Sequence, residues 1–304
     1  MTVSPQDSTA AANEVFGRHA GFRALHAKGT LLKAVFTATP EAAALTRAAH
    51  MQGEPVGATI RVSNGAGDPR VPDYRSDVRG LAVKLYLSDG SRTDIVAQSA
   101  PRFPVHTPEE FLELLRAQRP GPAMAWKLPL FLVRHPDAIP RLPPNLPSLR
   151  PPASYATCTY YAIHAFKFID AQGGSRYVRY TLLPDAGDVR ISPREAKRRG
   201  RDYLQEEISR RVTEGRVSFT LELQIAAPGD NVDDPASNRK ERKRVRAGRL
   251  EITGLETERE TGGDVLVFDP TRVVDGIELS NDPVRGFRST AYSDSVSHRM
   301  SQAT

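Results

Sequence analysis

The chain has 304 residues, of which 39% are hydrophobic, so it can bury a substantial core in one large domain or two small ones. Its one cysteine, Cys158, excludes an intramolecular disulfide and a zinc thiolate cluster, which favours a reducing, cytoplasmic setting. The first twenty residues lack a signal-peptide pattern, and no window approaches the roughly 18 apolar residues of a membrane span. We therefore expect a soluble protein with no membrane partner.

The positive charge is unevenly distributed along the chain. Lys and Arg number 42 against 36 Asp and Glu, and residues 238–249, NRKERKRVRAGR, carry seven basic residues and one acidic residue. A run of this kind is usually a solvated surface segment. We expect no nucleic-acid partner, and binding of nucleic acid through this run is the least favoured of the functions considered.

Five segments alternate apolar and polar residues with the period of a β-strand: residues 57–64, 81–90, 158–170, 175–183 and 216–226. Each segment is bounded by glycine, proline or polar residues. The strands are not alternated one by one with helices, so the pattern predicts an α+β fold with an antiparallel sheet or barrel.

Helix signals stand between these strands. Thr107 begins a hydroxyl-capped helix with proline in its first turn, and Ser192 begins a polar helix that we expect to run to about Val212. Residues 119–152 hold too many prolines for a continuous helix or a central strand, and should wrap over the core as an irregular segment. Asp282 and Pro283 form the expected cap and first turn of a last helix.

Two groups of residues could carry chemistry. Arg61 and Ser63 point to the same side of their strand, and an interior face would let Ser63 orient an imidazole such as that of His26. Arg288, Tyr292 and Arg299 are spaced by four and seven, which places them within about 40° on one helix face. An arginine beside a phenol favours the phenolate, which is a suitable ligand for ferric iron.

Six short motifs in one order over residues 21–299 resemble haem catalases reduced to their core, the group called catalase-related peroxidases or minimal catalases. Residues 23–29, RALHAKG, resemble the distal-histidine motif of that family, and residues 61–63 and 77–86 resemble the two strands that follow it. Residues 94–101, 164–168 and the stretch from Phe268 to Tyr292 are similar to the later motifs.

The resemblance implies one domain over residues 21–304 after an N-terminal tail of residues 1–20. It implies haem b inside an antiparallel eight-stranded β-barrel of catalase type, with the wrapping segment and helices outside. A homodimer is compatible with this fold.

The resemblance also assigns site residues. His26 would be the distal acid/base, Ser63 its hydrogen-bond partner, and Gln98 the counterpart of the distal asparagine. Tyr292 would be the iron ligand and Phe103 would line the access route. The remaining cofactor-binding residues are arginines. Arg288 would hold Tyr292 as phenolate, and the haem propionates would be bound by Arg23, Arg61 and Arg299.

The chain departs from the large catalases at Gln98, which is one methylene longer than asparagine, and in the absence of a long N-terminal arm and a C-terminal helical domain. We therefore expect a haem peroxidase that reduces H2O2 or organic hydroperoxides with an external organic electron donor, and that has weaker catalase activity. The same motifs are also compatible with a hydroperoxide-rearranging enzyme similar to allene oxide synthases, and with a haem-binding protein without turnover.

Overall fold

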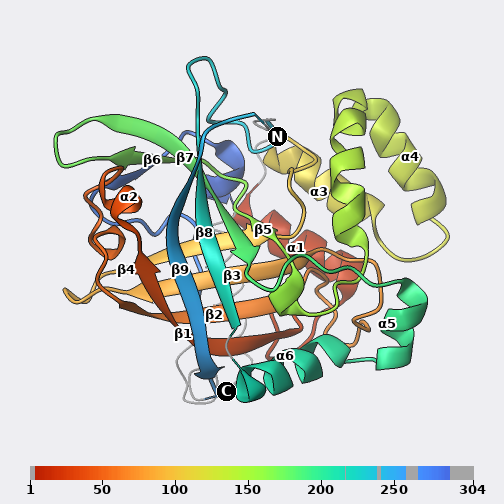
Figure 1. Ribbon diagram of the computed structural model, residues 1–304. Coiled ribbons are helices and arrows are strands. Elements are labelled where there is room, and N and C mark those ends of the chain that lie inside the picture. The colour runs from red at the N-terminus through yellow and green to blue at the C-terminus, as the bar shows by residue number, and fades with distance from the viewer. Residues whose placement is uncertain (1–3, 216, 238–240, 258–265, 288–304) are drawn as a thin grey trace.

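Eight antiparallel strands form a closed barrel in the computed structural model, which describes residues 4–215, 217–237, 241–257 and 266–287 (Figure 1). Around the ring, each strand pairs with the next, and pairing of β7 with β8 completes the circle. The eight strands in ring order are β1 (Gly29–Ala38), β2 (Val56–Asn64), β3 (Arg79–Tyr86), β4 (Arg92–Gln98), β5 (Tyr160–Tyr161), β7 (Ser175–Pro184), β8 (Val217–Ile225) and β9 (Arg244–Leu255). The predicted α+β barrel is confirmed.

Two short strands extend the sheet beyond the ring. β6 (Phe166–Ile169) pairs with β7, and β10 (Ile277–Leu279) pairs with β6. The barrel interior is filled with apolar side chains such as Leu32, Ile60 and Phe219, each fully buried. Burial of one such side chain contributes roughly 1.5–3 kcal/mol, so this core is the main source of stability of the barrel.

The helices lie outside the barrel in two groups (Figure 1). One group contains α1 (Pro5–Phe16), α3 (Pro108–Ala117) and α4 (Met124–Arg134), with α3 in contact with both of the others. The second group contains α5 (Pro193–Arg199) and α6 (Tyr203–Glu214). The described residues also contain a short helix and four 3₁₀ helices: α2 (Pro40–Ala43), η1 (Ala49–Met51), η2 (Pro136–Arg141), η3 (Pro143–Leu149) and η4 (Tyr155–Thr157). The predicted last helix begins at Pro283 and is helical over residues 283–287 of the described range. No helix in the described ranges is long and apolar enough to cross a membrane.

The caps predicted for two helices are present. The hydroxyl of Thr107 accepts a hydrogen bond from the amide of Glu110, and that of Ser192 accepts one from the amide of Glu195. The second helix is shorter than we expected, because Gly200 has a φ of 114° that interrupts it between α5 and α6. Glycine adopts such a conformation without a steric penalty.

Two segments are more regular than we expected. The N-terminal tail contains α1, which begins at a capping box of Ser4 and Asp7 and packs its alanines against α3. The segment over residues 119–152 is not irregular throughout, because α4 forms despite Pro129 inside it. Pro129 cannot donate a backbone hydrogen bond. This loss is offset by burial of Phe131 in an apolar cluster that also contains Phe103.

The basic run over residues 238–249 is not simply a solvated surface segment. Residues from Arg244 onwards are part of β9, which pairs with β1 on one side and with β8 on the other. Two of its arginines form ion pairs across the sheet, Arg244 with Glu222 and Arg249 with Asp185. Because side chains alternate along a strand, a barrel strand can carry this much charge on its outer face.

Candidate active site

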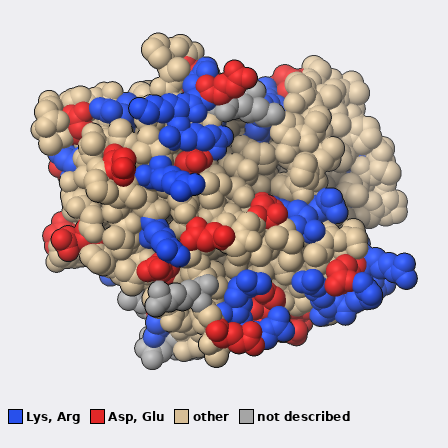
Figure 2. Space-filling view, in the orientation of Figure 1, with Lys and Arg blue, Asp and Glu red and all other residues tan. Residues whose placement is uncertain are grey.

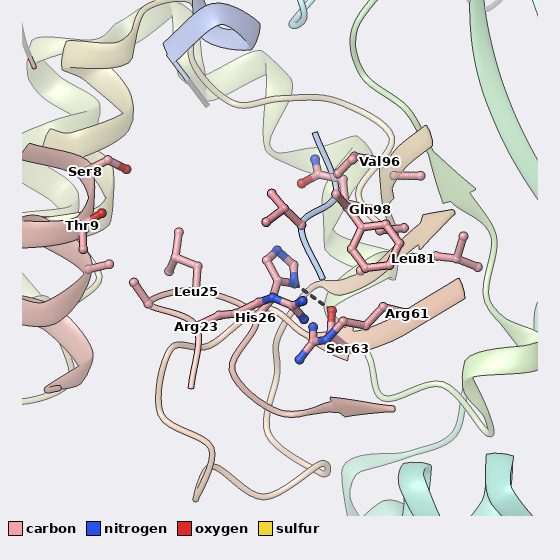
Figure 3. Close-up of a pocket in the computed structure, with 17 residues that line it drawn as sticks. Ser8, Thr9, Arg23, Leu25, His26, Arg61, Ser63, Leu81, Val96 and Gln98 are labelled. Carbon is pink, nitrogen blue, oxygen red and sulfur yellow. Dashed lines mark hydrogen bonds between the residues drawn. The ribbon is translucent and has the colours of Figure 1, made fainter. Parts of the chain in front are cut away.

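A cavity opens between the barrel wall and α1 (Figure 3). Its empty volume is about 870 Å³, which includes space that is open to solvent. The lining is mostly apolar, with a few polar side chains. The lining residues are Ser8, Thr9, Ala12, Arg23, Ala24, Leu25, His26, Arg61, Ser63, Gly80, Leu81, Ala82, Val96, Ala97, Gln98, Val267 and Phe268.

The strand register places three of these residues in one row across the sheet. Gly80 of β3 is opposite Ser63 of β2 and opposite Gln98 of β4. Directly opposed residues have their side chains on the same face, so Ser63 and Gln98 both face the cavity, with a glycine between them. Arg61, Ala82 and Val96 form the next row on that face.

His26 lies on the loop before β1, with its ring in front of this row. Its Nδ1 is 3.1 Å from the Ser63 hydroxyl (Figure 3), and its backbone amide donates a 3.0 Å hydrogen bond to the carbonyl of Gly65. It is the one described residue other than glycine with a positive φ, 55°. A conformation of this kind costs energy and is concentrated at functional sites.

The serine contact determines which ring nitrogen can accept a proton. If Nδ1 carries the hydrogen and donates it to the Ser63 oxygen, Nε2 is left as the acceptor, which is the tautomer that a general base needs.

Gly80 creates the space for this imidazole. A Cβ atom at residue 80 would lie 2.7 Å from the Ser63 hydroxyl oxygen and 2.8 Å from His26 Nδ1. Side chains do not approach a Cβ this closely, so only glycine fits between the two residues. The sequence patterns did not assign a role to Gly80, although an isolated glycine in a strand is a known signal of close approach.

Arg23 and Arg61 lie at the wall of the cavity. The Nη2 of Arg61 donates to the carbonyl of Ala27 at 3.1 Å, and the Arg61 side chain is almost completely buried. Arg23 donates to the carbonyl of Leu266 and lies over the ring of Phe268. Guanidinium groups in such a place suit a ligand that carries carboxylates.

Gln98 reaches the cavity from β4, and Figure 3 shows its amide on the same side of the pocket as His26. Its Nε2 donates a long hydrogen bond of 3.4 Å to the carbonyl of Ala100. The amide is therefore turned partly toward its own strand end.

Phe103 does not line the cavity. It is buried in an apolar cluster that is separate from the barrel core, where its ring stacks on that of Phe111 with 5.6 Å between the ring centroids. Helix α4 of the wrapping segment packs against this same cluster through Phe131.

Asp94 anchors the segment that carries Phe268, a role that the sequence did not indicate. It pairs with Lys84 across the β3–β4 ladder at 2.6 Å. Its second oxygen accepts hydrogen bonds from the amide of Asp269 and from Arg272, each at 2.8 Å. This buried cluster holds the later segment against the barrel wall.

Asp282 has the predicted role of a helix cap and a second role as the partner of His164. It accepts hydrogen bonds from the amide of Val284 and from His164 Nδ1, the latter at 2.6 Å. Burial opposes ionisation of the carboxyl, but these hydrogen bonds and the charge of His164 lower the pKa of Asp282 below its ordinary value. The predicted residues Arg288, Tyr292 and Arg299 lie outside the described residues.

The lining of the cavity suits a largely apolar group with acidic substituents. Apolar side chains from α1, β3, β4 and the segment at Phe268 form its walls, and two arginines lie at its edge. His26 and Gln98 supply polar atoms on one wall, and the absence of a side chain at Gly80 keeps space open beside the imidazole. These residues agree with a haem whose propionates require cations.

A family model described as catalase matches residues 18–304 of the chain. The chain is 45% identical to a catalase-related peroxidase of Mycolicibacterium paratuberculosis over 98% of this chain and 95% of that protein. It is 31% identical to a catalase-related peroxidase of Synechococcus elongatus over 98% of this chain and 89% of that protein.

The fold is similar to the crystal structure of a fungal catalase, with a TM-score of 0.82 and 24% identity. That similarity covers 96% of this chain but 62% of the fungal chain. The match to the family model over nearly the whole chain, together with the two relatives, shows that this protein belongs to the catalase family.

Proposed function

We propose that the protein is a haem-dependent peroxidase of the catalase family, which reduces H2O2 or organic hydroperoxides with an external organic donor. The observation that carries the proposal is the strained His26 held by Ser63 at the wall of a cavity whose arginines and apolar side chains would suit haem b. The family membership and the names of the two relatives support the same reaction class.

When bound, haem supplies the redox chemistry, and the protein supplies proton transfer, orientation and access. With haem bound, His26 Nε2 would take a proton from the peroxide oxygen next to the cofactor and return it to the other oxygen, which would leave as water when the O–O bond breaks, with the two electrons supplied by haem. By accepting a hydrogen bond from Nδ1, Ser63 would keep the ring in the tautomer that permits this transfer. General acid/base catalysis of this kind contributes on the order of 10²–10⁴ in rate.

Two groups of residues would hold the cofactor, those that line the cavity and those predicted near the C-terminus. Arg23 and Arg61, which line the cavity, would bind the propionates together with Arg299. Tyr292 is the proposed iron ligand and Arg288 the group that keeps it as phenolate. We further propose a cytoplasmic location and a homodimer.

The test is the absorption spectrum of the wild type, Tyr292→Phe and His26→Ala, each before and after addition of H2O2. We expect a haem band that changes in Tyr292→Phe. His26→Ala should keep the band but respond to peroxide roughly 10²–10⁴ times more slowly. A wild type whose haem does not respond to peroxide would instead be a carrier, and an isomerised hydroperoxide without donor oxidation would indicate a rearranging enzyme.

A further inference from the structure

Helix α4 is apolar on two opposite faces, and only one of them is buried. Phe131 is 1% exposed and packs with Leu128 and Leu132 against the cluster around Phe103. On the other side Trp126 is 57% exposed and Val133 is 76% exposed. A helix that is apolar all round is normally covered on every side.

Trp126, Leu130 and Val133 share one stripe, because at 100° per residue they fall within about 60° of each other. We call these three residues the α4 face. Six of the nine exposed large apolar side chains of the described residues lie between residues 124 and 146, and three of these six form the α4 face. In Figure 2 the surface over α4 is almost without charged side chains. An exposed apolar patch of this kind marks a binding surface.

The charge around the α4 face is positive. Residues 119–150 contain five basic residues and one acidic residue. Lys127 and Arg134 are about 20° apart on one flank of the helix. Two of the cations are neutralised, because Arg141 pairs with Asp137 and Arg134 pairs with Glu113. Among the described residues Lys127 and Arg119 have no carboxylate partner, so positive charge remains beside the α4 face. The partner must therefore combine apolar and anionic groups.

A second copy of the chain fits this charge pattern poorly. An antiparallel twofold contact along α4 would place Lys127 of each copy near Arg134 of the other, and α4 has no acidic side chain that could pair with Lys127. A lipid bilayer with anionic headgroups supplies both properties at once. Helices with tryptophan and leucine on one face and lysine or arginine beside it bind in the plane of such an interface.

We propose that α4 docks on an anionic lipid surface. The α4 face enters the headgroup boundary, and Lys127, Arg134 and Arg119 lie near the lipid phosphates. This revises the expectation, drawn from the sequence, that the protein has no membrane partner. The docking is peripheral, and it does not depend on the proposed peroxidase reaction.

The experiment is sedimentation of the holoenzyme with vesicles of phosphatidylcholine, with and without phosphatidylglycerol. We expect binding to the anionic vesicles that weakens as salt is added. Trp126 is the one tryptophan of the chain, so its fluorescence should shift to the blue when those vesicles are added. Lys127→Ala should weaken the binding about fivefold, the effect of one charge near an anionic surface.

Two exposed valines provide a matched pair of variants. Val133→Glu should weaken vesicle binding at least about tenfold, through lost apolar burial and charge repulsion. Val189→Glu adds the same charge at a 44% exposed valine outside α4 and should bind as the wild type does. Both should keep the haem spectrum and the rate with H2O2.

The proposal fails if the wild type does not sediment with anionic vesicles, or if the two valine variants bind equally. It also fails if light scattering shows that Val133→Glu abolishes self-association while vesicle binding is absent, since a second copy then covers the α4 face. A wild type without peroxidase activity would leave the vesicle result unchanged, so the two proposals are tested separately.

Discussion

Gln98 is the residue at which this chain differs from the large catalases in the expected distal site. Its amide faces the cavity but donates to the carbonyl of Ala100 at 3.4 Å. A shorter amide could not follow the same path to that carbonyl. The position of this amide should therefore affect the ratio of two reactions of the proposed enzyme, reduction by a second peroxide and reduction by an external donor.

We predict that Gln98→Asn raises oxygen release from H2O2 relative to donor oxidation by roughly 5- to 10-fold. That factor corresponds to one net hydrogen bond of about 1–1.5 kcal/mol to the peroxide in the transition state. The measurement compares oxygen evolution with oxidation of a dye donor. Gln98→Leu is the control and should lower the ratio, whereas an unchanged ratio in Gln98→Asn would show that the amide takes no part.

At the scale of elements, three neighbouring strands build one wall of the site, and β3 contributes by having no side chain at residue 80. We predict that Gly80→Ala displaces His26 or Ser63, since its Cβ would lie within 2.8 Å of both. A displacement of about 1 Å can cost roughly 10²-fold in rate, and we expect a loss of that size in the reaction with peroxide.

The matched control is Gly57→Ala on the adjacent strand β2, where an added Cβ meets no atom within 4 Å. Stopped-flow spectroscopy of the haem band should show normal peroxide reactivity in Gly57→Ala. Equal rates in the two variants would mean that the close approach at Gly80 does not position the imidazole.

At the scale of the whole molecule, stability depends on pH through a buried histidine far from the proposed chemistry. His50 is 2% exposed beside Phe36, and its Nδ1 has no hydrogen-bond partner among the described residues. Burial lowers the pKa of His50 from 6.5 to about 4. Between these values the unfolded chain binds a proton that the folded chain does not, so the free energy of unfolding falls as the pH is lowered.

We predict that this one group removes up to roughly 3 kcal/mol of stability between pH 6.5 and pH 4, at about 1.4 kcal/mol per pKa unit. His50→Phe should lose this part of the pH dependence. The measurement is urea unfolding at several pH values, with the half-buried His19→Phe as the control. The same slope in His50→Phe and the wild type would contradict the prediction.

Short-range patterns determined much of the site and of the fold class. The alternation along β2 predicted that Arg61 and Ser63 share one face, and the motif resemblance added His26 and Gln98; the structure brings all four to one cavity. This cavity lies on the outer face of the barrel wall, opposite to the apolar interior that contains Ile60, and not inside the barrel as the resemblance implied. Period-two patterning and caps are local properties, so they could be read along the chain for β2, β7 and α3.

Only the tertiary structure decided which distant residues meet. Closure between β7 and β8, and the row of Ser63, Gly80 and Gln98, depend on register between strands far apart in the sequence. Two elements were also missed in the sequence. One is α1, whose Ser8 and Thr9 line the cavity, and the other is β9, whose many basic residues made its apolar–polar alternation hard to recognise. The sequence by itself determined which residue types the site contains, because local period and motif spacing encode them. The tertiary structure decided the distances between them, because long-range packing and strand pairing have no local signal.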